Sequence, residues 1–188
     1  MASNADGLVA RMPWRAIGWG GAAALLALPF IAMQLTPEVD WTTSDFVAFG
    51  AMLLMVGVPL ELAARMSRNW SYRGGAALAL LGMFLTTWAN FAVGIVGSED
   101  NPANLLFFGA LLLGVAGAIV ARFRARGMAV AMIMTAAALG VVFVVAVSGP
   151  TDEPNVPHWR ELIGTSVFAA LFLASAALFR KASRARPA

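Results

Sequence analysis

Six long apolar runs alternate with short polar connections along the chain, and they decide what it can fold into. A helix that crosses the hydrocarbon core of a bilayer needs about 20 mostly apolar residues. The runs reach that length, and 60% of the 188 residues are hydrophobic against 12% charged. Soluble domains hold about 45–50% apolar and about 25% charged residues. We therefore predict an all-α, polytopic membrane protein with helices near residues 16–35, 45–64, 75–97, 104–122, 128–148 and 161–179.

The connections between these runs are short and rich in turn formers. The longest span about ten residues and contain Pro, Gly, Asn, Asp and Glu. We predict a single transmembrane domain over residues 1–188, folded as a six-helix bundle. The first run is longer than the apolar core of a secretory signal and is followed by Gln34, Leu35 and Thr36 instead of a cleavage site, so we expect it to be retained.

Charge predicts the orientation, because cytoplasmic loops hold an excess of Lys and Arg. Twelve of the 13 basic residues fall on one side: Arg11, Arg15, Arg65, Arg68, Arg73, Arg122, Arg124, Arg126, Arg180, Lys181, Arg184 and Arg186. Eight of the 10 acids fall on the other: Glu38, Asp40, Asp45, Glu99, Asp100, Asp152, Glu153 and Glu161. Both termini are therefore expected in the cytoplasm.

A repeat is suggested by three segments of similar sequence. FGAMLL at 49–54, FGALLL at 108–113 and FAALFL at 168–173 follow one another at offsets of 59 and 60. They would begin alternate helices, which predicts helical hairpins repeated in parallel orientation. The alternative is a chance match between helices rich in Ala and Leu.

Composition excludes several classes of site. With no cysteine, the chain has no disulfide, cysteine zinc site or thiol nucleophile. No predicted span contains a lysine to anchor retinal, and none contains the paired histidines of a membrane-buried haem. We predict no cofactor. The pI of 10.6 follows from the topology signals, and no nucleic-acid-binding motif accompanies it.

Glu61 is the ionisable residue that comes closest to lying inside a span. It follows Pro59 and precedes Arg65 by four residues, a spacing that favours a local ion pair. An interfacial pair beside a proline kink is one interpretation. The other is a carboxylate that couples transport to a proton or cation.

The most polar intramembrane stretch contains Thr86, Thr87 and Asn90. Such side chains usually hydrogen-bond to neighbouring helices and fix their packing. Alternatively they line a polar path, joined by Gln34.

The loop GSEDNPAN at 97–104 is the densest polar run. Locally, Asn101 is expected to cap the following helix with Pro102 at its first position. The functional alternative is an outer-face cation site, because carboxylate and amide oxygens suit hard cations. Its candidate residues are Glu99, Asp100, Asn104, Asp152, Glu153 and His158.

His158 lies three residues before Glu161, so the two could share a helix face. An interfacial histidine beside Trp159 is the simpler interpretation. The alternative is a catalytic metal site, which would need further ligands from the outer acids.

Small residues four apart allow close helix approach, within the bundle or in an oligomer. They are Gly18 and Ala22, Gly20 and Ala24, Gly114 and Ala118, and Ala170 and Ala174. The arginines predicted at the cytoplasmic face could hold anionic lipid head groups such as cardiolipin. These are Arg65, Arg68, Arg73, Arg122, Arg124 and Arg126.

The stretch from Trp88 to Asn104, with its GSEDNPAN loop, and the WTTSDF segment at 41–46 resemble small, uncharacterised bacterial inner-membrane proteins. The resemblance covers about a third of the chain. It implies a multi-pass protein of the bacterial inner membrane and no activity.

Three functions remain open on these residues. The first is a non-enzymatic accessory subunit that associates with a larger membrane complex or with itself. The second is a small-solute or cation/proton-coupled transporter or channel that uses Glu61, Thr86, Thr87 and Asn90. The third is an enzyme acting through His158 and nearby carboxylates.

Overall fold

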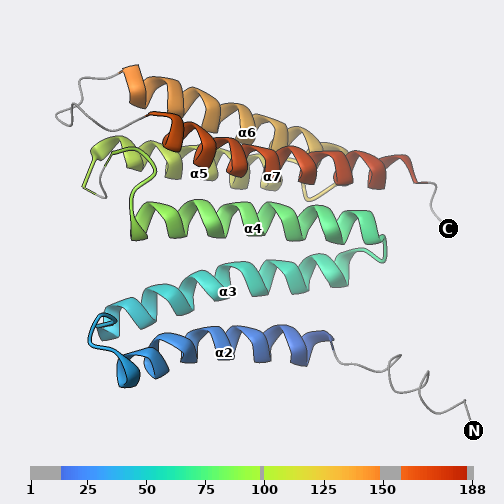
Figure 1. The fold of residues 1–188 in the computed structure, drawn as a ribbon. Coiled ribbons are helices and arrows are strands. Elements are labelled where there is room, and N and C mark those ends of the chain that lie inside the picture. Colours follow the sequence, from blue (N-terminus) through green and yellow to red (C-terminus); the bar gives the residue numbers. More distant parts are fainter. Residues whose placement is uncertain (1–13, 98–99, 149–157, 186–188) are drawn as a thin grey trace, which may run out of the picture. The chain divides into compact units, whose positions relative to one another are not determined.

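The structure is a computed structural model that describes residues 14–97, 100–148 and 158–185, in which there are helices and no strand. Within these ranges, six helices are long and apolar enough to cross a membrane, which confirms the prediction of an all-helical protein with six helices of that kind. They are α2 (Trp14–Leu35), α3 (Thr43–Met66), α4 (Trp70–Ala92), α5 (Leu105–Val120), α6 (Ala125–Ser148) and α7 (His158–Arg184) (Figure 1). The fourth reaches that length together with the 3₁₀ turn before it, as Pro102–Val120. The orientation and the repeat stay predictions.

The third helix differs most from its predicted range. It spans Trp70–Ala92, whereas 75–97 was expected. Asn69 starts it, because its side-chain oxygen accepts hydrogen bonds from the N–H groups of Ser71 (2.8 Å) and Tyr72 (3.3 Å). Beyond the helix the chain turns through Gly94 and Gly97, whose φ angles of 71° and 64° suit glycine. Caps and glycines therefore set the helix ends, and the apolar run alone does not.

The start of the fourth spanning segment agrees with its sequence signal. Asn101 accepts a hydrogen bond from the N–H of Ala103 at 2.9 Å, and Pro102 opens a short 3₁₀ helix, η1 (Pro102–Asn104), that leads into α5. The missing N–H of Pro102 costs nothing at this position. The predicted cap is confirmed.

By its internal contacts the chain divides into two compact units, Met1–Leu62 and Ala63–Ala188. Within the first unit, α2 and α3 form an antiparallel hairpin. The indole of Trp19 covers Gly57, where an added Cβ would lie 3.0 Å from the ring, and Leu26 lies over Gly50. The single transmembrane domain expected from the sequence stays a prediction.

Within the second unit, α7 packs against both α4 and α6, and α6 packs against α5. Its core is filled by side chains that are almost wholly inaccessible: Phe107, Leu139, Phe172 and Phe179. Gly114 of α5 lies against Thr135 of α6, so the predicted close approach at Gly114 is confirmed.

The turn between α5 and α6 is tight and pinned by a third helix. Arg122 and Phe123 adopt left-handed backbone angles (φ 49° and 56°), which are uncommon outside glycine. The hydroxyl of Tyr72 on α4 donates a hydrogen bond to the Phe123 carbonyl at 2.7 Å, and its ring meets Phe179 edge-on. We call this end of the second unit the turn end, and the opposite end, with residues 93–97 and 100–104, the loop end.

Candidate functional site

Glu61 joins the two helices of the first unit. One carboxylate oxygen forms an ion pair with Arg15, and the other accepts a hydrogen bond from the indole N–H of Trp19 at 3.2 Å. These two partners come from α2. The pair with Arg65, one turn along α3, that the sequence suggested stays a prediction. The Glu61 side chain is 14% exposed and that of Arg15 is 54% exposed, so solvent screens the pair only partly.

Polar side chains of α4 form hydrogen bonds to backbone carbonyls of the same helix. The Thr86 hydroxyl donates to the Gly82 carbonyl at 2.8 Å, and the Asn90 Nδ2 group donates to the Thr86 carbonyl at 2.9 Å. Thr86, Thr87 and Asn90 are all buried in the second unit. Gln34 lies exposed on α2 in the first unit.

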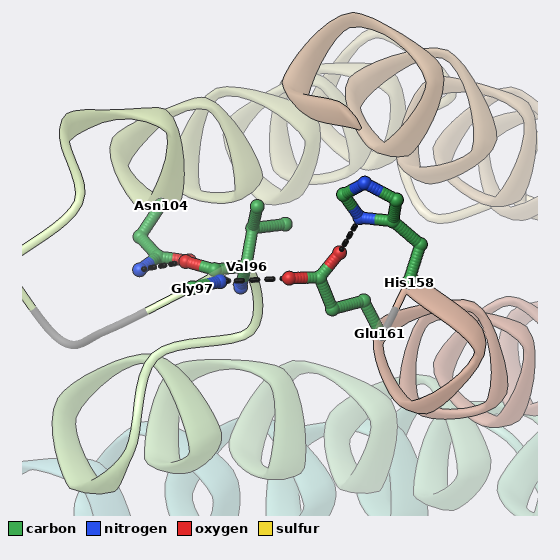
Figure 2. Close-up of polar contacts among 5 residues, drawn as sticks. All are labelled: Val96, Gly97, Asn104, His158 and Glu161. Carbon is green, nitrogen blue, oxygen red and sulfur yellow. Dashed lines mark hydrogen bonds and ion pairs between the residues drawn. The ribbon is translucent and has the colours of Figure 1, made fainter. Parts of the chain in front are cut away.

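At the loop end, a buried carboxylate ties α7 to the segment that follows α4. The Glu161 side chain is 6% exposed, and its Oε1 accepts a hydrogen bond from the N–H of Gly97 at 2.8 Å. Its Oε2 lies 3.0 Å from Nδ1 of His158, as Figure 2 shows. The predicted contact between His158 and Glu161 is therefore present, and Gly97 is a partner that the sequence did not suggest.

Asn104 holds the same segment from the other side (Figure 2). Its Oδ1 accepts hydrogen bonds from the N–H groups of Ile95 and Val96, both at 2.9 Å, and its Nδ2 donates to the Val96 carbonyl at 3.2 Å. The side chain is buried. Its amide thus satisfies backbone groups of the loop that follows α4.

The candidate cation site falls partly on residues that the structure does not describe. Glu99, Asp152 and Glu153 lie outside the described residues, and Asp100 is exposed. Among the described residues there is no group of three or more His, Asp or Glu side chains that could hold a metal ion. What the structure brings together is the pair of His158 and Glu161, with Asn104 occupied by backbone.

One of the six arginines proposed for lipid contact forms hydrogen bonds to backbone carbonyls. Arg73 donates hydrogen bonds to the carbonyls of Ala64 and Ser67, both at 2.7 Å, and its guanidinium lies 5.4 Å from the ring centre of Trp70. It therefore caps the carboxyl end of α3. The other five are exposed: Arg65, Arg68, Arg122, Arg124 and Arg126.

The contact between α4 and α7, which we call the seam, contains Asn90 and two polar groups that sequence analysis missed, Ser175 and Thr165. The Ser175 hydroxyl donates to the Gly75 carbonyl at 2.7 Å. Two further polar atoms are buried there without a hydrogen-bond partner, Oδ1 of Asn90 and Oγ1 of Thr165. Thr165, Phe172 and Phe179 recur every seven residues, and this spacing was the available signal that they share one face.

No protein-family model, curated protein or solved structure matches this chain.

Proposed function

We propose that this chain is a multi-pass protein of the bacterial inner membrane, with both termini in the cytoplasm, that acts by association and not by catalysis. It serves as an accessory subunit of a larger membrane complex or of a homo-oligomer. The observation that carries the proposal is the contrast between the glycines of α2 and those that face helix contacts elsewhere in the chain.

Glycines at helix contacts in the second unit are covered. Gly75 and Gly82 lie against phenyl rings, and Gly114 and Gly117 lie against Thr135 and Ala131. Glycine inside a helix costs about 1 kcal/mol relative to alanine, and close approach of a neighbouring helix is the usual compensation in membranes.

On α2 the described residues supply no such neighbour. Gly18, Gly20 and Gly21 fall within four residues, and a Cβ added at any of them meets no atom within 4 Å. In the 18-residue apolar stretch of α2 no residue is buried, whereas 39% of the residues in the apolar stretch of α4 are buried. Lipid can cover an apolar helix, but three clustered glycines are better explained by a neighbouring protein helix.

The polar groups support the same function. Glu61, Asn104 and Thr86, which were candidates for transport or ion binding, are engaged with partners that hold the chain together. Side chains used in this way stabilise a scaffold.

The test is the mass of the full-length tagged protein, extracted in native nanodiscs from its own host. We expect a reproducible heteromeric or homo-oligomeric mass. Gly20→Leu should reduce that species, because a large side chain blocks close approach. Gly140→Leu is the matched control, since Gly140 on α6 also has open space around it. A monomer alone in the wild type, or equal loss in both variants, contradicts the proposal.

A transporter or channel is the second candidate, favoured by the unpartnered oxygen of Asn90. Along the seam, however, Phe172 and Phe179 fill the space over Gly82 and Gly75 toward the turn end. A path through the seam would have to open there. Loss of solute flux in vesicles on Asn90→Leu, with folding intact, would support this candidate over association.

A further inference from the structure

The seam between α4 and α7 has a regular register. The Phe179 ring lies against Gly75, and the Phe172 ring lies against Gly82. Each step is seven residues along both helices, which run in opposite directions. Seven residues make about two helical turns, so the same faces meet at each step. One further step places Thr165 opposite Ala89.

At this third step the paired side chains are smaller, and one of them is polar. A phenyl ring against a glycine is replaced by a threonine against an alanine, so the pair fills less space than the pairs before it. Asn90 follows Ala89 directly on α4. Asn90 is 5% exposed and Thr165 is 3% exposed, so both lie away from bulk solvent. Extending the register of Phe179 with Gly75 and Phe172 with Gly82 puts them at the same level of the seam.

The Thr165 hydroxyl does not make the bond that two other buried threonines of this protein, Thr86 and Thr135, make. Thr86 and Thr135 each donate to the carbonyl four residues earlier, at 2.8 Å and 2.9 Å. Thr165 Oγ1 has no such partner. Asn90 shows the same feature: its Nδ2 bonds to the Thr86 carbonyl, and this leaves Oδ1 unpaired.

We propose that Oδ1 of Asn90 and Oγ1 of Thr165 together hold one internal water molecule that bridges α4 and α7. The water donates one hydrogen to the amide oxygen and shares a second hydrogen bond with the hydroxyl. Buried waters make two to four such bonds to groups that would otherwise be unsatisfied. The inference is independent of the proposed association.

Water suits these partners better than a metal ion does. Hard cations such as Ca²⁺ take about six to eight oxygen ligands, and the seam offers two neutral ones. Glu161, one turn from Thr165 toward the loop end, already accepts from Gly97 and contacts His158. Exchange with solvent is expected from the loop end, because the Phe172 ring fills the seam on the other side.

The test is water-edited solid-state NMR on the isotope-labelled, full-length protein in lipid bilayers. It measures how fast magnetisation passes from water protons to Asn90 Cγ and Thr165 Cβ. We expect transfer several-fold faster than to Thr135 Cβ, the matched control, because Thr135 is equally buried but bonded to Ala131. Equally slow transfer at all three residues overturns the proposal.

A variant separates a bridging water from a direct contact. Thr165→Val keeps the shape of the side chain and removes the hydroxyl, so water transfer to Asn90 should slow markedly. Unchanged water transfer to Asn90 in this variant contradicts a bridging water. In the wild type, slow water transfer together with a direct contact between the Thr165 hydroxyl and the Asn90 amide also contradicts it. If the valine variant does not fold, the wild-type comparison with Thr135 still decides.

Discussion

The hydroxyl of Ser175 on α7 donates a hydrogen bond to the backbone carbonyl of Gly75 on α4, 2.7 Å away and one turn from the ring of Phe179. A carbonyl inside a helix already accepts one bond from its own helix, and its second lone pair is rarely reached by a neighbour. Glycine permits the approach because it has no side chain in the way. The two helices therefore meet closely at this level.

This contact predicts that bulk at Gly75 destabilises the second unit. An added Cβ would lie 3.1 Å from Cγ of Phe179, so Gly75→Ala forces the ring or the helix to shift. Overpacking of this kind costs about 1–3 kcal/mol. Thermal unfolding in detergent should show a lower Tm. Gly140→Ala, where the added methyl meets nothing, should leave the Tm equal or higher, and the opposite ranking would contradict the packing described.

Ser175→Ala should have a smaller effect than Gly75→Ala. It removes one buried hydrogen bond without adding bulk, and the Gly75 carbonyl keeps its helical position. The expected loss is about 1 kcal/mol in the free energy of unfolding. Ser183→Ala, at an exposed hydroxyl on the same helix, is the control. No difference between the two serine variants would show that the interhelical bond contributes nothing.

Glu161 should stabilise the loop end mainly through Gly97. Glu161→Ala leaves a buried N–H without an acceptor and should cost about 1.5–3 kcal/mol. Glu161→Gln retains an acceptor oxygen and should cost less. His158→Ala should cost under about 1 kcal/mol, because its side chain is 54% exposed and solvent screens the pair. Amide hydrogen exchange at Gly97 gives the local measurement, and unchanged exchange in Glu161→Ala would refute this role.

Glu61 on α3 should stabilise the contact with α2 through Arg15 and Trp19. Glu61→Gln keeps an acceptor for the Trp19 indole and removes the charge that faces Arg15. A partly exposed ion pair contributes about 0.2–1 kcal/mol, so we expect faster amide exchange in α2 and a small loss of stability. Glu38→Gln, at an exposed acid, is the control. Lost solute flux with unchanged exchange would favour the coupling carboxylate instead.

The proposed orientation can be tested with single cysteines, because the chain contains none of its own. We expect a membrane-impermeant thiol reagent, added to intact spheroplasts, to label Asp100→Cys. Ala185→Cys should react only after the membrane is opened. Both positions are exposed, so accessibility of the side chain does not limit the reaction. The reverse pattern would overturn the cytoplasmic placement of the termini.

Sequence analysis succeeded where the signal was local. Apolar runs of transmembrane length are sufficient to predict six helices, because hydrocarbon requires backbone groups to be satisfied within the helix. The Asn101 cap and the contact between His158 and Glu161 also follow from spacing along the chain. The extra turn at Trp70 was missed because a polar cap, Asn69, starts the helix before the apolar run begins.

The missed contacts join residues far apart in sequence. The Arg15 and Trp19 partners of Glu61 lie on the preceding helix, and the bond from Ser175 to Gly75 spans 100 residues. The hydropathy of two apolar helices does not indicate which of their faces meet. The register that we infer for the seam puts Thr165 level with Asn90, and it rests on the contacts of Phe179 with Gly75 and of Phe172 with Gly82.

The pairing of α4 with α7 has a consequence for biogenesis. These are the first and last complete helices of the second unit, so its closing contact has the longest sequence separation in that unit. Ribosomes deliver the chain from its amino end, and α4 enters the membrane before its partner has been made. Until α7 arrives, Gly75 and Gly82 lack the phenyl rings that cover them, and lipid or an insertion factor must shield this face. The packing of the second unit is thus completed only after α7 has been made.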